Sequence, residues 1–119
     1  LLRLIGADLK KRIRTETDLI GRYGGEEFLV VMYNVLSDKA LHIAEGIRKA
    51  IATLHERYPN EMVGQTTISI GVFCDIPSDA APFVKMIHKA DCALYRAKQS
   101  GRNQVVFYDT TMDKIDKEQ

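Results

Sequence analysis

The sequence predicts an α/β fold, a two-layer sandwich in which helices pack on a mixed sheet. Two observations lead to this prediction. Apolar residues recur at helical spacing in three segments, and short runs rich in β-branched and aromatic residues separate these segments. The resulting order is helix, hairpin, helix, strand, helix, strand. Elements in this order bury their apolar faces by packing the helices against a sheet.

The first part of the chain is expected to form a helix and a hairpin. Apolar side chains lie at helical spacing within residues 1–14. Two strands follow at 19–23 and 26–32, joined by Gly24-Gly25. A Gly-Gly loop suits the primed turns of antiparallel hairpins, because both positions can take positive φ.

The middle of the chain is expected to form a long helix and a buried strand. The helix is expected from Asp38 to about His55, and Ser37 is the candidate N-cap. Residues 66–73, "TTISIGVF", are rich in β-branched side chains and predict a strand.

A last helix and a short strand complete the predicted order. Ser78 or Asp79 is the candidate N-cap, and Pro82 is expected in the first turn, where proline is tolerated. Gly101 is expected to end the helix, and a strand is expected at 104–108. The two hairpin strands and the two later strands need another element between them, and the first helix has no earlier element to pack on. We therefore expect an N-terminal strand and helix to be missing.

Composition excludes several classes of protein. The 119 residues fit one small domain, and a hydrophobic content of 45% excludes a disordered chain. The net charge of +1 creates no field for nucleic acid, so no nucleic-acid partner is expected. Cys74 and Cys92 lack metal or redox spacing and are expected to be free thiols in a reducing compartment. No apolar run approaches the length of a membrane span.

Two adjacent carboxylates, Glu26 and Glu27, follow the glycines of the hairpin. Successive strand side chains point to opposite faces, so these carboxylates need different partners. A carboxylate beside glycines can hold Mg²⁺, a cation that takes one or two protein carboxylates together with phosphates. The alternative is a plain hairpin with two solvated glutamates. The physics of these residues alone favours this alternative slightly.

A basic pair, Lys98 and Arg102, lies four residues apart at the end of the last helix. The repulsion between the two charges is removed if a polyanion lies between them. The alternative is two solvated charges placed favourably on the helix dipole, and it is preferred on the spacing alone. No G-x-x-x-x-G-K-[ST] motif is present, so the phosphates of a nucleotide would not be held by a P-loop.

Three stretches resemble one protein family. "RYGGEEF" at 22–28 resembles the signature of the GGDEF family, the diguanylate cyclases, in its GGEEF form. "TISIGV" at 67–72 and "ADCALYRAKQSGRNQV" at 90–105 resemble the next strand and the last helix of that family. The resemblance implies a nucleotidyl-cyclase, palm-like fold for residues 1–108, as the C-terminal portion of a GGDEF domain. The charged tail at 109–119 is expected to be frayed.

The resemblance also implies a reaction. Members of the family condense two GTP molecules into cyclic di-GMP and release pyrophosphate. Each of two protomers presents one GTP, so a homodimer is implied, with two Mg²⁺ ions per active site. The implied site residues are Glu26 as metal ligand and general base, Glu27 as the second acidic residue of the metal site, Gly24 and Gly25 against the nucleotide, and Lys98 and Arg102 on the triphosphate.

Part of the family pattern is missing from this sequence. The first-strand metal aspartate and the guanine-reading residues would precede Leu1. We therefore expect a longer protein with an upstream sensory or regulatory domain, in the cytoplasm or as the cytoplasmic part of a membrane-anchored sensor. The fragment alone is not expected to be active. The alternatives are a degenerate GGDEF module that binds nucleotide or dimerises without catalysis and, less favoured, another palm-like nucleotidyl transferase.

A possible product-inhibition site is weakly matched. Family members carry R-x-x-D before the signature, and Asp18 occupies the aspartate position. Thr15 occupies the arginine position, Arg14 is one residue too early, and Gly46 stands where a second arginine is usual. Because an arginine fork reads its ligand through paired hydrogen bonds, these changes are not conservative. Weak or absent product inhibition is expected.

Overall fold

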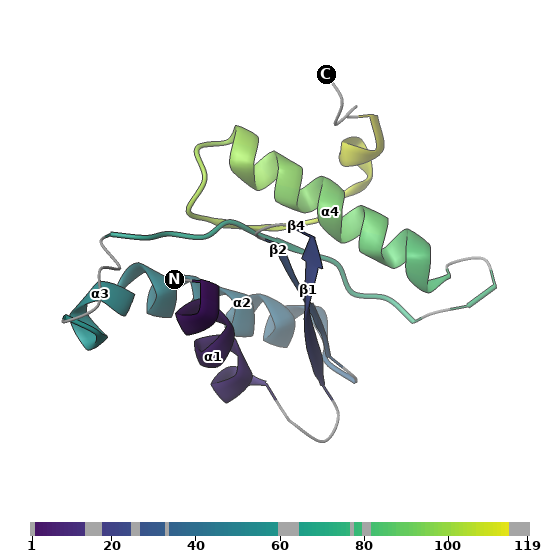
Figure 1. Ribbon diagram of the computed structural model, residues 1–119. Coiled ribbons are helices and arrows are strands. Elements are labelled where there is room, and N and C mark those ends of the chain that lie inside the picture. Colours follow the sequence, from purple (N-terminus) through teal and green to yellow (C-terminus); the bar gives the residue numbers. More distant parts are fainter. Residues whose placement is uncertain are drawn as a thin grey trace.

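The computed structural model describes residues 2–13, 18–24, 27–32, 34–59, 65–76, 78–79 and 82–114. Helices and strands follow the expected order along the chain (Figure 1). They are α1 (Leu2–Arg12), β1 (Leu19–Gly24), β2 (Glu27–Val31), α2 (Ser37–Ala52), α3 (Leu54–Arg57), β3 (Ile70–Val72), α4 (Phe83–Gln99), β4 (Val105–Phe107) and the 3-10 helix η1 (Thr110–Lys114).

The antiparallel hairpin of β1 and β2 is confirmed, but its turn is shifted. The last strand pair joins Gly24 to Glu27, after a register shift between Arg22 and Gly24. The connection is therefore residues 25–26, which lie outside the described residues. The expected Gly24-Gly25 turn is wrong by one residue, because the irregular pairing lets Gly24 remain in β1.

The second strand pair is parallel and has helices on both faces. β3 pairs with β4, so the expected mixture of strand directions is confirmed, although the described strands form two separate pairs. Ile70 packs with the core of α1 and α2, whereas a Cβ at Gly71 would meet the backbone of α4. Figure 1 shows α4 on one side of this pair and α2 on the other. The structure thus adds a helix layer, which explains why this segment is apolar on both faces.

Two hydrophobic clusters hold these layers. The first joins α1 to α2 and α3, and two of its side chains, Ile51 and Leu54, are fully buried. The second joins α4 to the segment after β4. In this cluster the rings of Phe73, after β3, and Tyr108, after β4, pack edge to face with their centroids 5.3 Å apart. Met112 of η1 is only 2% exposed. Burial of Met112 explains why the segment to Lys114 is a short helix rather than the expected frayed tail; residues 115–119 lie outside the description.

The start of α2 differs from the sequence expectation. Ser37 is the first helical residue rather than the N-cap, which is Leu36 and makes no side-chain capping bond. The Ser37 hydroxyl is hydrogen-bonded to Cys74. Burial raises the pKa of the Cys74 thiol, and this hydrogen bond opposes that rise. Both cysteines are free, as expected.

The end of α2 and the start of α4 also differ from the positions that the sequence predicts. Thr53 interrupts the helix expected to reach His55, and its hydroxyl donates to the carbonyls of Lys49 and Ala50 at 3.3 and 3.2 Å. Such bonds to the preceding turn compete with regular helix geometry. The N-cap of α4 is Pro82, not Ser78 or Asp79. The amides of residues 85 and 86 both donate to the Pro82 carbonyl, so proline begins the helix without losing a donor.

A buried carboxylate ties α1 to α3. Asp8 accepts hydrogen bonds from Arg12 at 3.0 Å and from Arg57 at 2.8 Å. Burial alone would raise the pKa of Asp8, but the hydrogen bonds and charges of both arginines outweigh burial and lower it. Arg57 also donates to the Ala50 carbonyl at 2.9 Å. The short helix α3 is thereby held against the end of α2.

Both described strand pairs leave unpaired edges. Within the described part of the chain, β2 pairs only with β1 and β3 pairs only with β4. We expect residues 1–119 alone to aggregate or to complete the sheet by strand exchange or dimerisation, because unpaired edges recruit other strands. Sedimentation and calorimetry test this expectation. A monodisperse monomer that melts cooperatively would contradict it.

Candidate functional site

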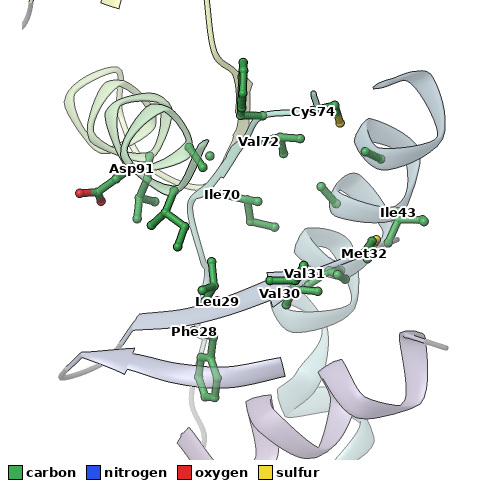
Figure 2. Close-up of a pocket in the computed structure, with 18 of the residues that line it drawn as sticks. Phe28, Leu29, Val30, Val31, Met32, Ile43, Ile70, Val72, Cys74 and Asp91 are labelled. Atoms are coloured by element: carbon green, nitrogen blue, oxygen red, sulfur yellow. The ribbon is translucent and has the colours of Figure 1, made fainter. Parts of the chain in front are cut away.

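An apolar groove of about 1650 Å³ lies between β2 and β3. Figure 2 shows Val30 and Val31 of β2 facing Ile70 and Val72 of β3, with α2 and α4 on either side. Lys98 and Arg102 also belong to its lining. The structure therefore places the basic pair on the lining of one groove, which sequence reasoning did not foresee because its walls come from five separate elements, α1, β2, α2, β3 and α4.

The end of α4 determines where Arg102 lies. Ser100 is the C-cap, and Gly101 takes a φ of 114°, which an L side chain rarely adopts. The Arg102 amide then donates back to the Ala97 carbonyl at 2.9 Å, the closing bond of a Schellman motif. The chain thus reverses around the last turn of the helix, which carries the partly exposed Lys98. The glycine predicted to end the helix is confirmed in that role.

Two successive left-handed residues follow this glycine. Arg102 has a φ of 63° and Asn103 a φ of 47°. Such a conformation costs about 1–2 kcal/mol for an ordinary L residue and less for asparagine. Hydrogen bonds offset this cost. The side-chain Nε2 of Gln104 donates to the Ser100 carbonyl at 3.0 Å and to the Arg102 carbonyl at 3.1 Å, and the backbone N–H of Asn103 donates to the Ser69 hydroxyl at 3.2 Å. The exposed Arg102 side chain therefore projects from a fixed backbone.

The acidic tip of the hairpin is only partly described. Gly24 ends β1 and Glu27 begins β2, whereas Gly25 and Glu26 lie outside the described residues, as does the side chain of Glu27. The roles expected for these residues remain predictions. Among the residues that the structure describes, no group of three or more His, Cys, Asp or Glu could hold a metal ion.

The weak product-inhibition motif is also only partly described. Asp18 is 6% exposed and directly precedes β1, whereas Arg14 and Thr15 lie outside the description. Gly46 lies in α2, and a Cβ there would meet nothing within 4 Å. A Cβ at this position would therefore meet no close neighbour, so backbone contact does not require glycine there.

We expect weak or absent binding of cyclic di-GMP through Asp18, because the arginines that would complete the site are displaced or missing. Calorimetric titration of cyclic di-GMP into the full-length protein, with and without Asp18→Ala, measures this. The matched control is Asp38→Ala, which removes an exposed carboxylate at the start of α2. Binding at about −8 kcal/mol, roughly micromolar, that is lost only in Asp18→Ala would show that Arg14 completes the site.

The fold and site define an α/β domain in which the basic end of α4 lies on the lining of one groove. Comparison with known families agrees with this description. The family described as "Diguanylate cyclase, GGDEF domain" matches residues 1–104, so the chain belongs to the GGDEF family.

Individual relatives support the assignment. Diguanylate cyclase A of Treponema denticola is 35% identical over 108 residues, which cover 91% of this chain and 29% of the relative. The structure of the active GGEEF domain of a diguanylate cyclase from Vibrio cholerae is 30% identical, with a TM-score of 0.74, over 92% of this chain and 67% of that one. The GGDEF domain of DgcB from Caulobacter crescentus, solved in complex with c-di-GMP, is 27% identical, with a TM-score of 0.76, over 89% and 61%.

The chain spans less than a third of the length of the first curated relatives that it matches. No helix in the described ranges is long and apolar enough to cross a membrane.

Proposed function

We propose that the protein is a diguanylate cyclase that condenses two GTP molecules into cyclic di-GMP and releases two pyrophosphates. The observation that carries this proposal is the basic pair, Lys98 and Arg102, on one groove of a chain that belongs to the GGDEF family. Two relatives named as diguanylate cyclases share about a third of its residues.

The reaction needs two protomers, each with one bound GTP. The 3′-oxygen of each GTP attacks the α-phosphorus of the other, and the bond from that phosphorus to the pyrophosphate leaving group breaks. Two P–O bonds form and two break, and each attacking hydroxyl gives its proton to Glu26 of the protomer that binds it. Because phosphoryl transfer depends on positioning and charge, Lys98 and Arg102 would hold the triphosphate in line for attack.

The donor chemistry of the hairpin fits a divalent cation. Glu26 and Glu27 offer carboxylate oxygens, the ligands that Mg²⁺ prefers, and Mg²⁺ usually takes only one or two carboxylates beside phosphate oxygens. Two bound ions would neutralise charge on the phosphates as it develops. Gly24 and Gly25 carry no side chain, which would let the nucleotide approach the backbone.

The second candidate is a GGDEF module that binds nucleotide or dimerises without catalysis. Both candidate functions are compatible with regulation by an attached sensory domain or by a separate protein. The structure of SiaD from Pseudomonas aeruginosa, a relative solved in complex with its activator SiaC, is a precedent for such control.

One incubation separates the two candidates. The full-length protein is mixed with GTP and MgCl₂, and the nucleotides are resolved by chromatography. Cyclic di-GMP together with one pyrophosphate per GTP consumed supports the cyclase. GTP that is retained by the protein but not consumed supports the binding module.

A further inference from the structure

Arg48 of α2 reaches the turn that carries Arg102. Its Nη1 donates to Oδ1 of Asn103 at 2.9 Å, a contact between residues 55 positions apart in the chain. The other edge of the guanidinium faces Glu45, to which Nε donates at 2.9 Å and Nη2 also donates. The Arg48 side chain is only 19% exposed. It is therefore held at both ends rather than extended into solvent.

The chemistry of this contact requires arginine. A guanidinium presents several N–H groups in one rigid plane, so one edge can bind a carboxylate while the remaining group binds an amide oxygen. Glu45 fixes the orientation of Arg48, and its own pKa is lowered by the hydrogen bond and charge of Arg48. A lysine could not make the same three bonds with one geometry.

Asn103 connects Arg48 to the basic pair, because it accepts the hydrogen bond from Arg48 and directly follows Arg102 in the chain. Its side-chain Oδ1 accepts a hydrogen bond from Arg48, and its backbone N–H donates to the hydroxyl of Ser69, just before β3. The two bonds come from different elements, α2 and the segment that leads into β3. Together they fix the left-handed pair Arg102–Asn103. Backbone strain of this kind persists only where surrounding contacts determine it, and it is common at functional sites.

We propose that Arg48 is a positioning residue for the basic pair. Acting through Asn103, it holds the Arg102–Asn103 turn so that the Arg102 guanidinium reaches the same anionic ligand as Lys98. This inference rests on the proposed function, in which that ligand is the triphosphate of GTP. Arg48 itself does not belong to the groove lining, so its effect on GTP is transmitted by the turn.

A double-mutant cycle in the full-length protein tests the inference. Arg48→Met is expected to raise KM for GTP about tenfold, the usual effect of losing a hydrogen bond made by a charged group, with kcat changed much less. Arg102→Ala is expected to raise KM at least as much. In the Arg102→Ala background, Arg48→Met should add almost nothing, because the group that it positions is gone.

Two controls separate positioning from general stability. Lys49→Met removes a neighbouring exposed charge from α2 and should leave KM unchanged. Arg48→Lys keeps the positive charge but cannot bridge Glu45 and Asn103, so it should behave like Arg48→Met. Circular dichroism and thermal melting show whether each variant is folded.

The outcomes distinguish the inference from the proposed function. Unchanged GTP use in Arg102→Ala would overturn the role of the basic pair. If Arg102→Ala raises KM and Arg48→Met either has no effect or adds fully in both backgrounds, the positioning role is wrong. Should Arg48→Met fail to fold, Asn103→Ala removes the acceptor at the other end of the contact, and an unchanged KM in that variant overturns the inference.

Discussion

Glu26→Gln is expected to abolish cyclic di-GMP synthesis in the full-length protein while leaving its melting temperature unchanged. The substitution keeps the size of the side chain but removes the charge proposed to accept the hydroxyl proton and to bind Mg²⁺. Loss of a general base alone costs about 10²–10⁴ in rate. Stability should not change, because the substitution keeps the size of the side chain at the tip of a hairpin whose last described pair joins Gly24 to Glu27.

The measurement is the rate of cyclic di-GMP formation at saturating GTP and MgCl₂. Glu56→Gln is the matched control, since it makes the same chemical change at an exposed position of α3. It should retain full activity. Turnover by Glu26→Gln within a few-fold of wild type would show that this carboxylate is neither the base nor an essential metal ligand.

Gly71→Ala is expected to lower the free energy of unfolding by about 3 kcal/mol or more, at the upper end of the cost of overpacking. A Cβ at Gly71 would lie 2.2 Å from the Ala90 carbonyl oxygen and 2.2 Å from the Leu94 amide nitrogen. Both are backbone atoms of α4, so no side-chain rotation relieves the clash. The helix would have to move away from β3. Lys98 on this helix and Arg102 after it would then shift relative to the rest of the groove lining.

Gly46→Ala provides the matched control for this prediction. The chemical change is identical, but a Cβ at Gly46 meets nothing within 4 Å and the residue lies inside α2. Replacing a helical glycine with alanine should therefore stabilise the protein by about 0.5–1 kcal/mol. Urea denaturation of the full-length protein measures both variants. A Gly71→Ala protein as stable as wild type would show that β3 and α4 are not in close backbone contact.

Local patterns determined much of this protein. The 3.6-residue period of apolar side chains placed α2 and α4, because a helix in a small domain must bury one face. Gly101 ended α4 because only glycine accepts its φ without strain. The four-residue spacing of Lys98 and Arg102 was visible in the sequence as well, and it led to the hypothesis of a polyanion site. Each of these features depends on residues that are neighbours along the chain.

Other features were decided only by contacts between distant segments. Ser37 was expected to cap α2, but its hydroxyl meets Cys74, and no local pattern carries that information. The groove between β2 and β3 exists because five elements converge on it. The bond from Arg48 to Asn103 is the clearest case, because the two residues that it joins lie 55 positions apart in the chain. Only the packing of α2 on the strand pair of β3 and β4 brings the two side chains within hydrogen-bonding distance.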